Sequence, residues 1–197
     1  MKISKRGAVY RSKIKTRELE TGERCIEGYF AVFDKKTELW EGSYEILKQG
    51  SFASSIAMND IRCLFNHESG IVLGRQSAGT LELREDETGL WGKVVINPND
   101  TAALDVYARV ARGDITGCSF GFYPEDETPE EDSDGVLWVI NSANTFEVSI
   151  CTFPQYDETQ VQARDKAFII CQKRKLEERR KKLKRRIGVI NEKKKTY

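Results

Sequence analysis

Gly-Cys-Ser-Phe-Gly-Phe, residues 117–122, is the stretch from which the fold and function of this chain can best be approached. Successive side chains of a β-strand point to opposite faces, so Cys118, Phe120 and Phe122 are expected to enter a core. Ser119 then lies between two glycines on the other face, where a second backbone could approach closely. The stretch alone fits two interpretations: a glycine-rich strand whose serine has no special role, or a strand that presents a nucleophilic hydroxyl.

Short segments rich in β-forming residues occur over most of the chain and are separated by turn-forming residues. We expect strands at residues 8–10, 26–33, 44–47, 61–65, 80–84, 90–96, 117–122, 136–140 and 145–153. A short helix is expected after an N-cap at Ser51, and a longer one between an N-cap at Asn99 or Asp100 and a stop at Gly113. This order predicts a mainly β fold with flanking helices (α+β): a closed β-barrel of about seven strands surrounded by helices.

One segment between these strands is strongly acidic. Residues 125–134 contain seven Asp or Glu together with Pro129. Like charges repel one another and proline donates no backbone hydrogen bond, so this segment is expected to be a solvent-exposed, mobile loop.

The 197 residues carry a net charge of only +1, but the two signs are separated along the chain. Residues 164–197 contain 15 Lys or Arg and 4 Asp or Glu, a net charge of +11, whereas residues 1–163 carry a net charge of −10. Apolar residues recur every seven positions from Ile169 to Ile190, which predicts a helix with one narrow apolar stripe. We therefore expect a β-barrel domain at 1–163 and a basic helical tail at 164–197. The tail is either a solvated helix or weak coiled coil, or an arm that binds nucleic acid or an acidic protein.

The composition also disfavours several classes of protein. No apolar run reaches the roughly 18 residues that cross a bilayer, and no apolar segment follows the basic N-terminus as in a secretory signal. The five cysteines are scattered and form no C-x-x-C pair, which favours a reduced cytosolic protein with buried free thiols. With one histidine and no clustered cysteines, no zinc site is expected, and the sequence indicates no other metal or cofactor.

His67 is the only histidine in the chain, and it directly follows an expected buried strand. A lone histidine is usually structural, but rigid strand ends are also where catalytic side chains are commonly held. A serine nucleophile needs a base, and an imidazole most often supplies it. If Ser119 is a nucleophile, His67 is the imidazole available to activate it.

Glu147 is the candidate for the third group that usually orients such an imidazole. Phe146, Val148 and Ile150 alternate with it and are expected to face the core, which leaves a carboxylate on the other face of an apolar strand. An outward charge on an edge strand is an equally good interpretation, and Ser149 on the same face is a competing polar partner.

Two further residues compete for these roles. Glu68 adjoins His67, but neighbours in a sequence seldom orient one another, so it is the weaker candidate for the acid. Cys118 could itself be a nucleophile, but its position beside Phe120 and Phe122 favours a small core residue.

The motifs of residues 25–160 resemble, in wording and in order, those of the prohead maturation proteases of tailed bacteriophages. The matching stretches are Glu27-Gly28-Tyr29 with Ala31-Val32-Phe33, Gly50-Ser51-Phe52, Leu64-Phe65-Asn66-His67-Glu68, Val72-Leu73-Gly74-Arg75, Gly79-Thr80-Leu81, Gly89-Leu90, Ser119-Phe120-Gly121-Phe122, and Glu147-Val148-Ser149 with Pro154. Each motif is weak alone, whereas eight in the family's order form a strong signal.

The resemblance implies a serine endopeptidase with a fold similar to the herpesvirus assembly proteases, a β-barrel surrounded by helices. The histidine of the family's Asn-His motif is the general base, which corresponds to His67. The serine of its Ser-Phe-Gly-Phe motif is the nucleophile, which corresponds to Ser119. The herpesvirus relatives use a second histidine as the third member. This chain has no second histidine, so the role passes to an acid, for which Glu147 lies at a comparable place.

The implied biology is phage head maturation. The protease would be packaged inside the prohead, in the host cytoplasm, and would cut the scaffold or the scaffold-like arm of the major capsid protein, and itself. Its partners would be those substrates, with a homodimer by analogy with the herpesvirus enzymes, and no membrane. The alternative is a non-catalytic virion assembly protein that keeps the barrel and uses its basic tail as a scaffold- or DNA-binding arm.

Overall fold

The computed structural model describes residues 6–11, 14–20 and 22–153 of the chain. The described elements, in order, are β1 (Arg6–Arg11), β2 (Lys15–Glu18), β3 (Arg24–Val32), β4 (Thr37–Trp40), β5 (Ser43–Leu47), α1 (Ala53–Met58), β6 (Arg62–Phe65), β7 (Glu68–Arg75), β8 (Leu81–Glu85), β9 (Gly89–Val95), α2 (Thr101–Arg112), β10 (Gly117–Asp132) and β11 (Gly135–Cys151). All of them belong to one compact unit, residues 1–157. The expected basic tail at 164–197 and its helix lie outside the described residues and stay predictions.

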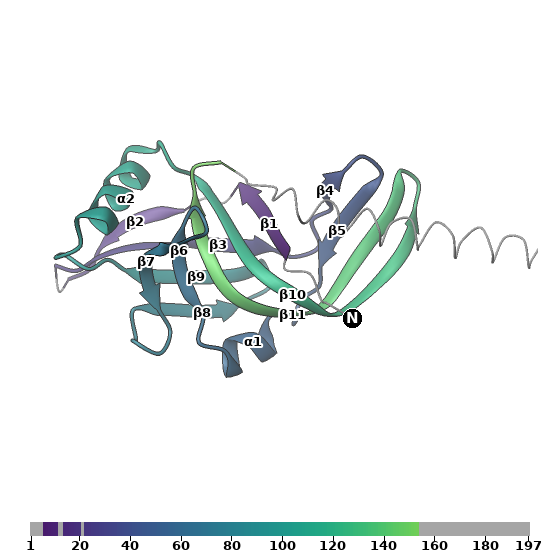
Figure 1. Cartoon of the computed structure of the whole chain (residues 1–197), viewed down its shortest axis with the longest axis horizontal. Helices are drawn as coiled ribbons and strands as arrows, with labels where there is room; N and C mark the ends of the chain where they lie inside the picture. The colour runs from purple at the N-terminus through teal and green to yellow at the C-terminus, as the bar shows by residue number, and fades with distance from the viewer. Residues whose placement is uncertain (1–5, 12–13, 21, 154–197) are drawn as a thin grey trace, which may run out of the picture. The chain divides into compact units, whose positions relative to one another are not determined.

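The described strands form two sheets (Figure 1). The larger sheet has seven strands in the order β1-β10-β11-β5-β4, with β6 paired to both β11 and β7. The smaller sheet has four strands in the order β2-β3-β9-β8. β11 is the strand that most of the larger sheet shares. It pairs with β10 along one side, and on the other side it pairs in parallel first with β5 and then with β6.

The mainly β character and the flanking helices are confirmed, but the closed barrel is not. No ladder among the described strands joins the two sheets into a barrel, and these strands number eleven rather than about seven. The separate strands expected at 136–140 and 145–153 are one strand, β11. Strand existence follows from local composition, whereas pairing depends on residues far apart in the sequence, so the topology was the weaker part of the prediction.

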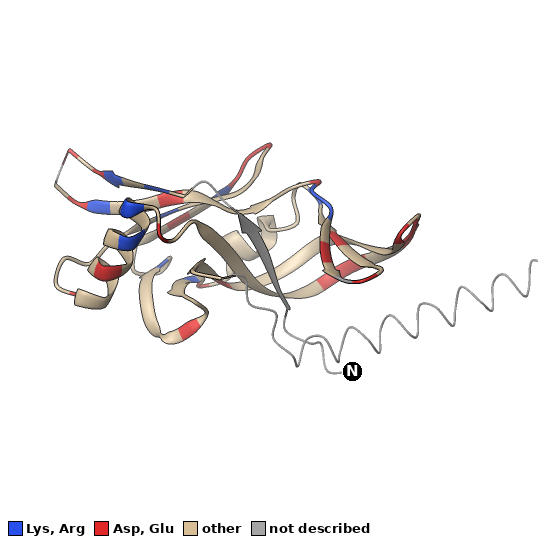
Figure 2. Cartoon of the chain, turned by 90° about the horizontal axis from the view of Figure 1, so that it is seen from above, with Lys and Arg blue, Asp and Glu red and all other residues tan. Residues whose placement is uncertain are grey.

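Most of residues 125–134 are exposed, as expected, but the prediction of a loop is wrong, because β10 continues to Asp132 and pairs with β11 up to its end (Figure 2). Beyond Phe122 the outer edge of β10 has no further partner among the described strands, and charged residues and prolines are tolerated on such an edge. Lys36 Nζ lies 2.6 Å from Asp132 and 3.0 Å from Asp134. Its hydrogen bond lowers the pKa of Asp132 and offsets part of the local repulsion.

The predicted caps of α2 are confirmed, whereas the predicted cap of α1 is wrong. Asp100 caps α2 by accepting hydrogen bonds from two backbone N–H groups, and Gly113 ends that helix with a φ of 89°, both as predicted. The N-cap at Ser51 is wrong: the cap residue of α1 is Phe52, which has no side chain able to cap. The Phe52 N–H instead donates to Glu85 Oε1 at 2.8 Å, so a carboxylate from β8 replaces the expected hydroxyl.

The core contains the side chains that the opening stretch placed there. Cys118, Phe120 and Phe122 are fully buried, as predicted. The Phe120 ring centroid lies 5.1 Å from that of Phe52, edge to face, and 5.0 Å from that of Phe122. Ser119 is fully buried as well, so the opposite face of β10 is covered by other groups rather than bare.

Candidate active site

The only histidine of the chain lies in a two-residue turn between β6 and β7. Asn66 and His67 form this turn, with φ angles of 51° and 62°. Positive φ at both central residues is what a type I′ hairpin turn requires, and glycine is the usual second residue because it has no Cβ. A histidine in this position is strained, and such strain is found most often where a side chain is needed for function.

The His67 imidazole contacts Glu147, the acid that the sequence singled out. Their atoms Nδ1 and Oε1 lie 2.7 Å apart, and the Glu147 side chain is 4% exposed against 21% for His67. β6 and β11 are parallel neighbours, and Phe65 at the end of β6 lies opposite Ile150, so the turn that follows β6 lies beside the part of β11 that carries Glu147. An ionised carboxylate can only accept a hydrogen bond, so next to a carboxylate Nδ1 is the donor of this contact and Nε2 is the ring nitrogen that stays available to another partner.

The second carboxylate oxygen of Glu147 is also hydrogen-bonded. Ser149 Oγ donates to Oε2 at 2.6 Å, from two residues along the same strand. Burying a carboxylate is costly unless its oxygens are paired, and here both are. Ser149 is therefore a partner of Glu147, where the sequence left it as a competitor.

A β-bulge shapes the strand at this point. Gly121 lies opposite Glu147 but Phe122 lies opposite Thr145, so Phe146 is the extra residue on β11. The expectation that Phe146 faces the core is wrong. A Cβ on Gly121 would lie only 2.6 Å from the Phe146 ring and would meet Glu147 Oε1, which places this ring on the face that carries the acid.

Ser119 lies on that same face, one strand away. The register pairs it directly with Ser149, and directly opposed residues on antiparallel strands have Cβ atoms about 4.5–5.5 Å apart. The structure thus brings His67 and Glu147 into contact and puts Ser119 next to the serine that supports Glu147. The sequence missed the supporting contacts, because a bulge and a strand register leave no local periodic signal.

Glu68 and Cys118, the competing candidates for the acid and the nucleophile, lie in other surroundings. Glu68 is exposed at the start of β7, and Cys118 belongs to the core, as predicted. Burial, and next the nearby charge of Glu147, raises the pKa of Cys151 to about 12. Burial also raises the pKa of Cys63, and the four described cysteines are buried and form no disulfide with one another. Thiols in this state stay protonated and are poor nucleophiles.

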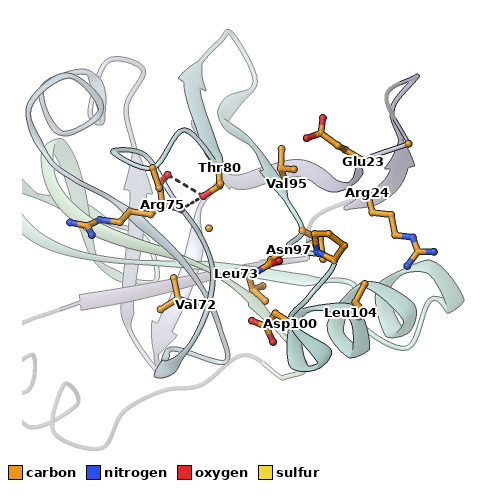
Figure 3. A pocket seen from close by; sticks show the side chains of 15 residues that line it. Glu23, Arg24, Val72, Leu73, Arg75, Thr80, Val95, Asn97, Asp100 and Leu104 are labelled. Carbon is orange, nitrogen blue, oxygen red and sulfur yellow. Dashed lines mark hydrogen bonds between the residues drawn. The ribbon is translucent and has the colours of Figure 1, made fainter.

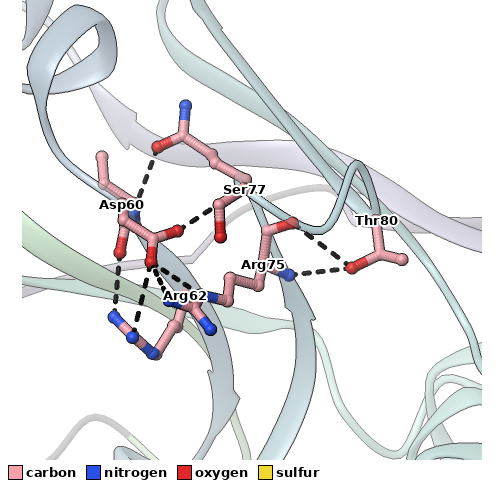
Figure 4. Close-up of polar contacts among 7 residues, drawn as sticks. Asp60, Arg62, Arg75, Ser77 and Thr80 are labelled. Atoms are coloured by element: carbon pink, nitrogen blue, oxygen red, sulfur yellow. Dashed lines mark hydrogen bonds and ion pairs between the residues drawn. The ribbon is translucent and has the colours of Figure 1, made fainter.

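A charged cluster fixes the far end of the β6–β7 hairpin (Figure 4). Arg75 Nε donates to Asp60 Oδ2 at 2.6 Å, and the Ser77 N–H donates to Asp60 Oδ1 at 3.2 Å. Arg62 Nη2 lies 3.5 Å from the same carboxylate. The hydrogen bond from Arg75 is the main cause that holds the pKa of Asp60 well below its usual range. The hairpin that carries the histidine turn is thus also held at its opposite end.

The described part of the chain also has a cleft of about 750 Å³, which is a separate feature (Figure 3). β7 and the start of α2 contribute to its lining, including Val72 and Leu104, but His67, Ser119 and Glu147 do not. Within residues 6–11, 14–20 and 22–153 no three His, Cys, Asp or Glu side chains are grouped as metal ligands. No helix in that part is long and apolar enough to cross a membrane.

Comparison with known proteins identifies the family. A family profile described as caudovirus prohead serine protease matches residues 12–174. The chain belongs to this family. The match contains His67, Ser119 and Glu147, and it confirms the resemblance seen in the motifs.

Two individual proteins are similar to this member of the prohead protease family. The prohead protease of Enterobacteria phage HK97 is 26% identical over 141 residues, which are 70% of this chain and 59% of the HK97 protein. The chain therefore spans less than two thirds of the length of that relative. The solved structure of the bacteriophage T4 capsid assembly protease, gp21, matches with a TM-score of 0.49 and 10% identity, over 75% of this chain and 98% of gp21.

Proposed function

We propose that the chain is a serine endopeptidase of phage head maturation, with Ser119 as nucleophile, His67 as general base and Glu147 as the acid that orients His67. The observation that carries the proposal is the 2.7 Å contact between His67 Nδ1 and Glu147 Oε1 in a member of the prohead serine protease family. The place of Ser119 on the same sheet face supports it.

The roles proposed for these three residues are those of acyl transfer. Glu147 holds the proton on His67 Nδ1, which leaves Nε2 to take the proton of Ser119 as its Oγ attacks the scissile carbonyl carbon. The protonated imidazole then gives that proton to the leaving amine, and an acyl-enzyme remains. His67 next takes a proton from water, whose oxygen attacks the ester carbonyl, and the acyl group leaves as a carboxylic acid while Ser119 regains its proton.

The proposed substrates are the scaffold or the scaffold-like arm of the major capsid protein, together with the chain itself, inside the prohead in the host cytoplasm. Membership of the prohead protease family supports this assignment. A homodimer, and contact of the basic tail with nucleic acid or an acidic protein, are further parts of the proposal that rest on the sequence alone.

The test is the replacement Ser119→Ala in the full chain, co-expressed with the major capsid protein from the same phage. Intact mass spectrometry should show cleaved capsid protein with the wild type and none with the variant, and a fluorophosphonate probe should label only the wild type. Ser69→Ala, which removes an exposed hydroxyl from β7, is the matched control and should behave as wild type.

Cleavage by Ser119→Ala would overturn the assignment of the nucleophile. A wild type that is neither cleaving nor labelled, but binds nucleic acid with strong salt dependence, would instead favour the non-catalytic assembly protein.

A further inference from the structure

The turn that carries His67 is tied to β11 by a side chain that has no part in the mechanism above. Asn66 Oδ1 accepts a hydrogen bond from the Thr152 N–H at 2.9 Å. The Asn66 N–H donates to the Ile150 carbonyl oxygen at 3.0 Å. Both bonds reach the end of the chain segment that also carries Glu147, so the turn backbone and the imidazole are fixed to the same strand.

We infer that Asn66 is a positioning residue, whose side-chain oxygen holds the histidine turn against β11 and so sets the imidazole against Glu147. The inference rests on the proposed serine protease function. Asparagine suits the place because it tolerates positive φ better than other residues with a Cβ, and because its amide oxygen is a good acceptor. One residue thus meets the demands of both the turn and the attachment.

The contact has more to do with catalysis than with folding. Thr152 is exposed, so its N–H can bond to water once Oδ1 is removed, and little stability is lost. The position of the imidazole is far more sensitive, because a displacement of about 1 Å in a catalytic group can slow a reaction roughly 100-fold. Loss of the Asn66 side chain should therefore change the rate of the chemical step much more than the fold.

Two replacements separate the side-chain acceptor from the backbone conformation. Asn66→Gly keeps the positive φ but removes the acceptor, whereas Asn66→Asp keeps the acceptor. The full chain is treated with a fluorophosphonate probe, which reports the maximal rate of serine modification and the half-saturating probe concentration. For Asn66→Gly we expect a maximal rate lowered about tenfold or more, with a half-saturating concentration within about twofold of wild type. Asn66→Asp should stay within about threefold of wild type for both values.

Asn97→Gly is the matched control. Asn97 Oδ1 accepts a hydrogen bond from the Asn99 N–H at 3.0 Å, so this replacement removes a bond of the same kind from a turn outside the proposed site. Its labelling rate should equal that of the wild type.

A second measurement does not depend on activity, because the chain has a single histidine. In protein labelled with ¹⁵N-histidine, the Nδ1 proton held by Glu147 should give a downfield signal in the wild type and in Asn66→Asp, and a weaker or shifted signal in Asn66→Gly. A maximal rate within about twofold of wild type for Asn66→Gly, or equal losses in the Gly and Asp variants, would overturn the inference. If the wild type itself is not labelled, the proposed function fails. The Nδ1 signal then decides the positioning role: an unchanged signal in Asn66→Gly overturns it, and a lost one supports it.

Discussion

At the level of single residues, the backbone of His67 is the feature with the clearest energetic consequence. Its φ of 62° lies in the left-handed region, which is unfavourable for any residue with a Cβ. Both His67→Ala and His67→Gly remove the contact with Glu147, but only glycine also relieves the strain. We therefore expect His67→Gly to have a free energy of unfolding about 1 kcal/mol higher than His67→Ala, measured by urea denaturation.

Ser69, two residues further on and exposed in β7, provides the control for this comparison because its φ is not positive. In a regular strand alanine is favoured over glycine by roughly 0.5–1 kcal/mol, so the order of the two variants should be reversed there. If alanine is favoured over glycine at position 67 as well, the turn does not strain His67.

Glu147 is the residue whose charge can be removed with the least change of shape. Glu147→Gln keeps the size of the side chain, but its amide nitrogen can donate to His67 Nδ1 and so stabilise the wrong tautomer. The corresponding change in a known serine protease triad lowers the turnover about 10⁴-fold, and we expect a loss of at least 100-fold in capsid cleavage here. An unchanged rate would remove Glu147 from the mechanism. The two hydrogen bonds of Glu147 offset the cost of burying its charge, and Gln carries no charge to bury, so the free energy of unfolding can stay normal while the rate falls.

At the level of elements, the packing of the Glu147 and Phe146 side chains of β11 over β10 depends on Gly121. A Cβ there would meet Glu147 Oε1 and the Phe146 ring, so Gly121→Ala must displace one of these side chains. Overpacking of this kind costs about 1–3 kcal/mol, and a shift of the carboxylate should lower the rate of fluorophosphonate labelling at least tenfold. Circular dichroism during thermal unfolding checks the loss of stability, and the rate of fluorophosphonate labelling checks the shift of the carboxylate.

Gly70→Ala is the control, because a Cβ at Gly70 would have no atom within 4 Å and the residue has no positive φ. It should leave both the melting temperature and the labelling rate close to wild type. If Gly121→Ala also leaves the melting temperature and the labelling rate unchanged, the carboxylate has room to move without loss of activity. The bulge then has no part in placing it.

The same elements show how far the sequence could be interpreted. The alternation of Cys118, Phe120 and Phe122, and the cap of α2 at Asp100, were predictable because each depends on residues within one turn or strand. The contact of His67 with Glu147 was anticipated as a pairing of roles, but its distance depends on the parallel ladder between β6 and β11, across 80 residues of sequence. The catalytic roles themselves stay predictions.

Two features of the site left no usable signal. Phe146 followed a regular alternation in the sequence, and only the register shift in the ladder shows that it is a bulged residue. The acidic composition of residues 125–134 suggested a loop, although an edge strand tolerates the same charges once an apolar partner strand is present.

At the level of the whole molecule, β11 carries most of what the site needs. Glu147 and its supporting Ser149 belong to this strand, and Ser119 lies opposite it on β10. The histidine turn is attached at Ile150 and just beyond the strand end. The cleft near α2 and the smaller sheet share none of these groups. The larger sheet is therefore the part of the molecule on which the proposed activity depends.

The parallel pairing of β6 with β11 also has a consequence for the moment at which the site appears during synthesis. His67 leaves the ribosome early, but Glu147, in the strand that holds the histidine turn, is made 80 residues later. A nascent chain that has reached only β10 has both the hydroxyl and the imidazole, and nothing to arrange them. Translation must pass residue 152 before the last anchor of the turn exists. The order of synthesis therefore delays the assembly of the proposed site until almost the whole described fold has been made.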